Sequence, residues 1–155
     1  MSVWRDLVRR GRGQSMIEFA LALPILLLTF LGLFDLGRAA YYYNSLSNLA
    51  REGARAGVII QDQTLWRTSG NSAGTYSGIA SYSGTGTIVG SVAAKAVMFD
   101  LSRTTVTIQA PFGTWRSQAS PLTVRVQYPF QPHFAGWIGL GPTINLQSQS
   151  TMRIQ

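Results

Sequence analysis

An uncharged apolar run near the start of the chain constrains its fold more than any other feature. The run extends from Phe19 to Phe34, and with Met16 and Ile17 it gives 19 residues interrupted only by Glu18. A membrane-spanning helix needs about 20 apolar residues. The sequence therefore predicts one transmembrane helix. Pro24 lies inside it, where proline either kinks the helix or is tolerated, as it often is in membranes.

Charges flanking this run predict its orientation. Four arginines precede it and a single one, Arg38, closely follows it. The positive-inside rule then keeps the N-terminus in the cytoplasm and exports the rest of the chain. A cleaved secretory signal peptide is the competing interpretation, but its apolar region spans only about 7–15 residues. The four arginines are Arg5, Arg9, Arg10 and Arg12.

Helical spacing continues beyond the run, which favours one long helix from about Gln14 to about Ile60. Its second half has an apolar face that needs the surface of a soluble domain. Asp35 and Arg38 lie three residues apart, so they can pair on the helix surface. The apolar face consists of Tyr42, Leu46, Leu49, Gly53, Ala56 and Ile60. Glycines at 32, 37, 53 and 57 permit close approach of other elements, and for Gly53 and Gly57 we expect packing on a sheet.

The remaining chain, 61–155, predicts an exported α+β domain. Residues 61–86 are rich in Ser, Gly and Thr without apolar periodicity, which predicts a long surface loop, with its Gly/Ser-rich part at 64–87. Its tyrosines serve either adhesion or only solvation. A second helix is expected over 87–102, with an apolar face of Ile88, Val89, Val92, Ala96 and Phe99.

Three segments then alternate with a period of two, which is typical of strands with one buried face. The apolar positions are Val106, Ile108 and Ala110; Leu122, Val124, Val126 and Tyr128; and Ile144, Leu146, Met152 and Ile154. The expected fold is α+β: a long N-terminal helix on a small antiparallel three-stranded sheet, with a second, shorter helix. An apolar connection folds back on the sheet edge or faces a partner; it contains Phe130, Phe134, Trp137, Ile138 and Leu140.

The residues available for chemistry are few. There is no cysteine, one histidine (His133) and six acids, four of them in the first 52 residues. We expect no catalytic residue, no metal site and no cofactor, because nothing near His133 in sequence completes a triad or a ligand set. The net charge is +7, but the basic residues outside the N-terminus are scattered, so no nucleic acid partner is expected.

The first third of the chain resembles a known family. A basic leader ends in Gly13; Gln14 follows, and Glu18 stands five positions after the glycine. This pattern resembles the class III signal of type IV pilins and pseudopilins. The longer stretch from Gly11 to Gly57, with "GQSMIEFALALP", "DLGR" and "AREGARAG", is similar to the TadE-like family, minor pilins of the tight-adherence (Flp-type) pilus. The implied fold is type IV pilin-like.

The resemblance implies a leader over 1–13, a transmembrane and assembly helix over 14–36 and its amphipathic continuation over 37–60. It implies cleavage by a prepilin peptidase between Gly13 and Gln14, with Glu18 and Pro24 setting register during assembly. The implied helix interface consists of Phe19, Leu23, Leu27 and Phe30.

The implied protein is a structural minor pilin in the bacterial inner membrane or, once assembled, in the extracellular pilus. Its implied partners are other pilin subunits, the prepilin peptidase, the inner-membrane assembly platform and membrane lipid. The alternative is a monomeric, membrane-anchored adhesin-like protein that binds through the Gly/Ser/Tyr loop. Residue by residue, Glu18 remains open between a register device and an interfacial acid that reaches headgroup water.

Overall fold

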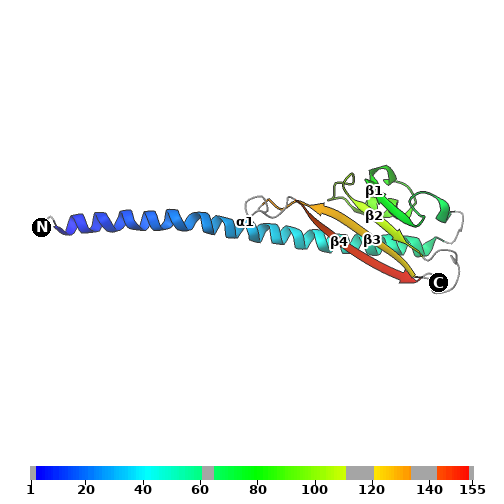
Figure 1. Ribbon diagram of the computed structural model, residues 1–155, viewed down its shortest axis with the longest axis horizontal. Helices are drawn as coiled ribbons and strands as arrows, with labels where there is room; N and C mark the ends of the chain where they lie inside the picture. The colour runs from blue at the N-terminus through cyan, green and yellow to red at the C-terminus, as the bar shows by residue number, and fades with distance from the viewer. Residues whose placement is uncertain (1–2, 61–64, 111–120, 134–142, 154–155) are drawn as a thin grey trace.

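The computed structural model describes residues 3–60, 65–110, 121–133 and 143–153, of which residues 3–12 and 66 are described by their backbone alone. One long helix extends far beyond a small α+β unit (Figure 1). We call residues 13–36 of this helix the shaft, and the rest of the described chain from residue 37 the head. The predicted α+β class is confirmed.

The long helix α1 spans Val3–Ile59. Its C-terminal end agrees with the prediction, whereas its N-terminal end lies well before the expected start at Gln14. Pro24 is inside α1, and the helix continues through it without interruption (Figure 1). The tolerated proline is therefore the alternative that the structure supports.

The sheet has four strands, not the three expected. They are β1 (Gly74–Ser77), β2 (Thr105–Gln109), β3 (Pro121–Phe130) and β4 (Ile144–Arg153), in the order β1-β2-β3-β4. All neighbouring pairs are antiparallel, and β3 and β4 pair along their full length from Pro121↔Arg153 to Phe130↔Ile144. The additional strand, β1, lies in the segment predicted to be a loop and pairs with β2.

The expected long surface loop contains a strand and two 3₁₀ helices within residues 65–87, because polar side chains organise this segment from within. Asn71 is only 2% exposed: its Oδ1 accepts a hydrogen bond from Ile88 N at 2.8 Å, and its Nδ2 donates to Leu65 O at 3.0 Å. Two short 3₁₀ helices, Leu65–Arg67 and Ile79–Tyr82, flank β1. Hydrogen bonds of this kind carry no apolar period in the sequence.

The second helix, α2, spans Ile88–Lys95 and is shorter than predicted. Thr87 caps it, because its side chain accepts a hydrogen bond from Gly90 N at 3.0 Å. The predicted apolar face is nevertheless buried, since Ala96 and Phe99 reach the core from the turns after the helix. The buried positions therefore continue along the predicted apolar pattern beyond Lys95, where the helix ends.

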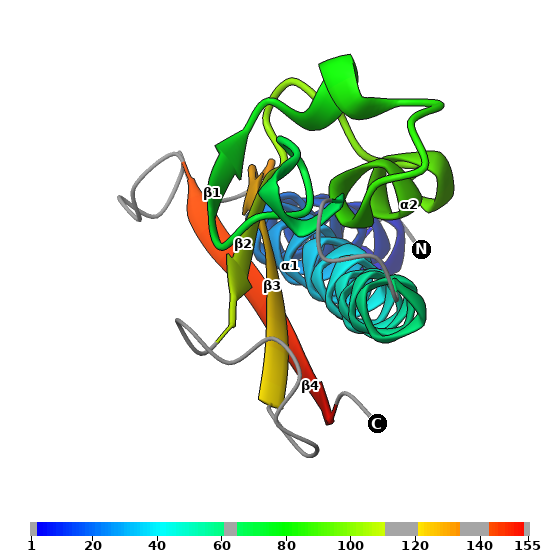
Figure 2. The same cartoon turned by 90° about the vertical axis from the view of Figure 1, so that its right-hand side faces the viewer.

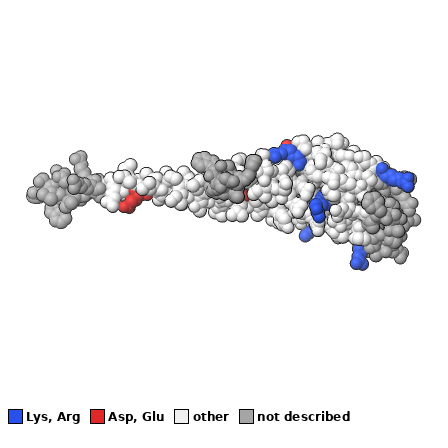
Figure 3. All heavy atoms as spheres, in the orientation of Figure 1, with Lys and Arg blue, Asp and Glu red and all other residues white. Residues whose placement is uncertain are grey.

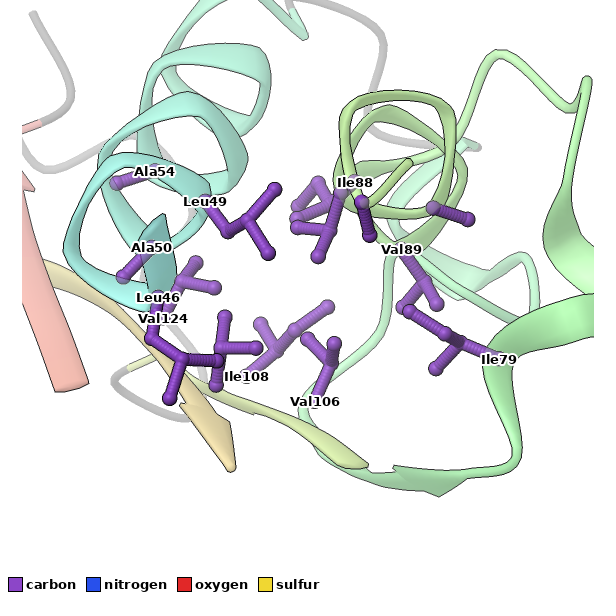
Figure 4. Packing of buried hydrophobic residues seen from close by; sticks show 14 of the residues in the cluster. Leu46, Leu49, Ala50, Ala54, Ile79, Ile88, Val89, Val106, Ile108 and Val124 are labelled. Atoms are coloured by element: carbon purple, nitrogen blue, oxygen red, sulfur yellow. The ribbon is translucent and has the colours of Figure 1, made fainter. Parts of the chain in front are cut away.

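Both helices cover the same face of the sheet, so the head has two layers (Figure 2). The core between them joins Leu46 and Leu49 of α1, Ile88 and Val89 of α2, and the inward residues of the strands (Figure 4). Gly53 and Gly57 are the points of closest approach. A Cβ on Gly53 would lie 2.8 Å from Val92 Cγ2 and 3.0 Å from Val124 Cγ1, and one on Gly57 would lie 2.2 Å from Leu122 Cδ2. The expected packing of these glycines on the sheet is confirmed.

The opposite face of the sheet is polar and its side chains pair across strands. Thr123 and Thr151 hydroxyls lie 2.7 Å apart, Arg125 donates to Gln149 Oε1 at 2.9 Å, and Gln127 Nε2 donates to the Oε1 of its neighbour on β4 at 2.8 Å. This face presents hydrogen-bonding groups to solvent and carries no core.

The predicted apolar connection is described only in part. Phe130, the last residue of β3, is 2% exposed. The other four, Phe134, Trp137, Ile138 and Leu140, lie outside the described residues. Whether they fold back or face a partner stays a prediction.

We predict that Gly53→Leu destabilises the head by about 1–3 kcal/mol, because a side chain there must displace Val92 and Val124 in a packed core. The measurement is thermal unfolding of the full-length protein in detergent micelles. Gly37→Ala is the matched control, since a Cβ at Gly37 meets nothing within 4 Å. Equal melting temperatures for wild type and Gly53→Leu would contradict the packing described here.

Candidate functional site

The shaft is an apolar surface that the chain itself leaves uncovered. Phe19, Leu23, Leu27 and Phe30, the predicted interface, are 62%, 36%, 52% and 61% exposed. From Met16 to Phe34 the helix rises about 28 Å, close to the ~30 Å thickness of a hydrocarbon core. By length and composition α1 is a candidate membrane span, and its most apolar window has a mean hydropathy of 2.3 with none of it buried. Lipid or neighbouring helices must cover such a surface.

Charge is distributed unevenly between shaft and head. Among the described residues, basic side chains lie on the head, while most of the shaft surface is uncharged (Figure 3). Asp35, near the end of the shaft, is only 6% exposed, so Glu18, near its start, is the one exposed acid there. Its Oε1 accepts a hydrogen bond from Gln14 Nε2 at 3.2 Å, one helical turn earlier. Gln14 thus supplies Glu18 with a neutral hydrogen-bond partner within the same chain.

The predicted processing site lies within continuous helix. Backbone from Val3 through Gly13 and Gln14 is α-helical, and nothing approaches within 4 Å of the position a Cβ on Gly13 would take. A protease that binds its substrate extended must first unwind this turn. Glycine lowers the cost of unwinding, because it destabilises a helix interior by about 1 kcal/mol relative to alanine.

Around the helix, the shaft presents more than one face. The four residues of the predicted interface follow one another at intervals of three or four, whereas Glu18 points about a third of a turn away from them. The structure therefore does not bring Glu18 and that stripe onto one face. Gly32 is open, with nothing within 4 Å of its Cβ position, so a second helix meets no obstacle there.

An aromatic cluster, which we call the junction cluster, packs α1 against the rest of the head just beyond the end of the shaft. Tyr42 of α1 stacks on Tyr128 at 5.6 Å between ring centroids, and Phe99 and Phe130 pack against Tyr42 at 5.3 and 5.5 Å. Arg38 lies over the Phe130 ring, 5.2 Å from its centroid, and its Nη1 donates to Asp35 Oδ1 at 3.1 Å. The predicted Asp35–Arg38 pair is confirmed.

Sequence patterns missed most of this junction cluster. Tyr42 was placed on the buried face, but its partners come from the end of β3 and from the turn after α2, which are brought together only by the fold. The only sign of this cluster in the sequence is an aromatic residue at the end of a predicted strand. Such a residue does not indicate which side chains it will contact.

The loop tyrosines are held by contacts within the head. Tyr76 and Tyr82 are half-buried, pack edge to face at 5.6 Å and bond to local serines: Tyr76 Oη lies 2.7 Å from Ser72 Oγ, and Tyr82 Oη 2.6 Å from Ser69 Oγ. They pack against the core. Whether this segment binds a surface, as the adhesin-like alternative expects, stays a prediction.

Titratable groups in the described part of the chain do not assemble into a reaction centre. Three potential metal ligands gather nowhere among these residues. His133 is exposed beside the end of β3. Hydrogen bonds from the Ser102 hydroxyl at 2.6 Å and its backbone N–H at 3.0 Å lower the pKa of Asp100 below its usual value. The Asp100 carboxylate therefore stabilises the turn that contains Ser102.

Taken together, these features define a class of protein: an apolar helical shaft, suited to a membrane or to a bundle of like helices, that carries an α+β head with its own apolar core. The family model described as TadE-like protein matches residues 13–55, which is most of α1. The resemblance predicted from the sequence is thereby confirmed over that segment, and it is consistent with a TadE-like pilin of the tight-adherence pilus system. That family is structural and not enzymatic, and the match supports association with pilus components in general. No curated protein and no solved structure matches the chain.

We predict that Tyr42→Ala lowers the free energy of unfolding of the head by about 2 kcal/mol. Truncating a fully buried aromatic costs about 3–5 kcal/mol, and Tyr42 is half-buried. Urea unfolding of the full-length protein in micelles provides the measurement. Tyr43→Ala, a neighbouring tyrosine that is 52% exposed, is the control and should change little. Equal free energies of unfolding for wild type and both variants would show that the junction cluster does not stabilise the head.

Proposed function

We propose that this chain is a minor pilin or pseudopilin of a tight-adherence pilus, which joins or primes the filament through residues 14–36. The observation that carries the proposal is the apolar part of the shaft, from Met16 to Phe34: about 28 Å of exposed apolar helix with one acid, Glu18, near its start. A plain membrane anchor gains nothing from that acid. The leader stays cytoplasmic and the head is exported, because the four arginines of the leader precede the span.

Processing converts Gln14 into a charged partner. Cleavage between Gly13 and Gln14 gives Gln14 an α-ammonium group, which carries the opposite charge to Glu18. Before cleavage, the side-chain amide of Gln14 hydrogen-bonds the carboxylate within the monomer without neutralising it. After cleavage, the ammonium of a neighbouring subunit pairs with Glu18, and only the correctly staggered neighbour brings the two groups together.

A low-dielectric surrounding makes this pairing selective. Near the middle of a bilayer, an isolated acid costs about 2.5–3.5 kcal/mol on insertion scales, and less near the edge. Opposite charges attract more strongly among packed helices than in water. Because Glu18 and the Phe19–Phe30 stripe point to different sides of the helix, they contact different neighbours. A subunit surrounded by several others uses both.

We predict that Gly13→Leu blocks cleavage, since a bulky side chain occupies the position before the scissile bond. The protein is expressed with an active prepilin peptidase and extracted from membranes, and its intact mass is measured by mass spectrometry. Wild type should begin at Gln14 and the variant at Met1. Gly11→Leu, the same change two residues earlier, should be processed like wild type. Recovery of wild-type protein that begins at Met1 would refute the processing step.

We predict that both Glu18→Ala and Glu18→Gln lower recovery of the protein in sheared filaments by about tenfold. A loss of ~1.4 kcal/mol of pairing energy corresponds to that factor. The Gln variant still accepts the hydrogen bond from Gln14 but lacks the charge, so it separates ion pairing from hydrogen bonding. Recovery is compared at equal membrane levels and equal processing.

The control for this experiment removes a different polar group from the shaft. Thr29 Oγ1 donates to Ile25 O at 2.9 Å within its own helix, so Thr29→Ala should leave recovery unchanged. Wild-type recovery for both Glu18 variants would show that Glu18 is only an interfacial acid. If only Glu18→Ala lowers recovery in filaments, the effect comes from the hydrogen bond and not from the charge.

A further inference from the structure

A pocket opens where the shaft meets the head. Its volume is about 520 Å³, and residues from three regions line it: Arg38 and Tyr42 of α1, Arg103 in the turn before β2, and the chain from Tyr128 to His133. It lies beside the junction cluster, whose rings give it a rigid aromatic wall. Neither processing nor filament assembly as proposed above uses this pocket.

The pocket is basic. Arg38 and Arg103 both line it, and His133 stands at its edge. Two carboxylates lie close: Asp35 bonds Arg38 Nη1 at 3.1 Å, and Asp100 interacts with Arg103 through its charge. Arg103 Nη1 also lies 3.5 Å from Gln131 Oε1. A guanidinium has five N–H donors, so each arginine keeps donors beyond these contacts.

The height of the pocket along α1 matches the headgroup layer of a membrane. Arg38 is four residues beyond Phe34, which is about 6 Å along the helix. The headgroup region extends about 5–8 Å beyond the hydrocarbon on each side. Leu36, between them, is still 69% exposed and apolar.

Below the pocket, the same side of the helix is apolar. Phe34, Leu31 and Leu27 precede Arg38 by four, seven and eleven residues, which places them on its face. Their exposed fractions are 62%, 46% and 52%. A molecule bound at Arg38 with its phosphate therefore has an apolar track for its hydrocarbon chains directly beneath.

We propose that this pocket binds the phosphate of an anionic phospholipid, with Arg38 and Arg103 contacting the phosphate and the acyl chains lying along Phe34, Leu31 and Leu27. Arginine forks match phosphate oxygens in a two-point contact, which is stronger than a neutral hydrogen bond. The apolar track selects a lipid over free phosphate. The bound lipid fixes the depth and the rotation of the head on the membrane. This proposal rests on membrane insertion of α1 and concerns the unassembled subunit, since Leu27 also belongs to the stripe that contacts neighbouring subunits in the proposed filament; it does not depend on cleavage.

The test uses the full-length protein in micelles, mixed with phosphatidylglycerol or phosphatidylcholine and examined by native mass spectrometry. Wild type should retain phosphatidylglycerol in preference to phosphatidylcholine. Arg103→Gln should lower phosphatidylglycerol retention by about tenfold, as expected for loss of a charged hydrogen-bonding contact. Arg38→Lys, which keeps the charge beside Asp35 but loses the fork, should also lower it.

Arg125→Gln is the matched control, because Arg125 lies on the outer face of the sheet and bonds Gln149. It removes the same charge and should retain lipid like wild type. If Arg38→Lys does not fold, as judged by circular dichroism, the exposed Arg103 decides the outcome alone. Equal retention of the two lipids, or equal retention by Arg103→Gln and Arg125→Gln, would overturn the proposal. Displacement of the lipid by excess inorganic phosphate would do so too, since the site would then recognise phosphate alone.

Discussion

The close contact between α1 and the sheet at Gly53 and Gly57 is the constraint on which the head depends. Because neither residue has a Cβ, the helix backbone approaches Val124 and Leu122 at distances that no side chain permits. That approach lets Leu46, Leu49 and the small residues between them close the core with only one further helix. The head is therefore built around the second half of α1, and it has no core without it.

Sequence predicted those parts of the structure in which apolar period and burial coincide. The second half of α1 and the strands β2 and β3 have one buried face each, so their patterns were readable. In β4 the alternation was also readable, although Leu146 and Met152 are only half-buried and Ile144 is 46% exposed. The segment before α2 was misread, because Asn71 organises it through two hydrogen bonds and polar residues follow no such period. The end of α2 was placed too late, because Phe99 is buried from a turn and a pattern of burial does not distinguish a turn from a helix. The type IV pilin-like topology remains an expectation.

The candidate site divides in the same way. An apolar stretch and a lone acid within it are visible in the sequence, so the shaft and Glu18 could be predicted from the sequence alone. The hydrogen bond from Gln14 was not, although its spacing of four residues permits it. The junction cluster was out of reach altogether, since Tyr42, Phe99 and Tyr128 are far apart in the chain and meet only after the sheet has formed. Contacts between residues that are distant in sequence cannot be predicted from the pattern of a single sequence.

The unbroken course of α1 through the junction gives the molecule a fixed rotational phase. Helix turns by about 100° per residue, so one residue inserted between Phe34 and Tyr42 would swing the head by that angle around the shaft and move it by about 1.5 Å. Seven inserted residues, nearly two full turns, would restore the facing to within about 20°. The length of this connection therefore encodes which side of the head faces a given neighbour. A single insertion would change that side, but one placed after Arg38 would also separate Arg38 from Phe130.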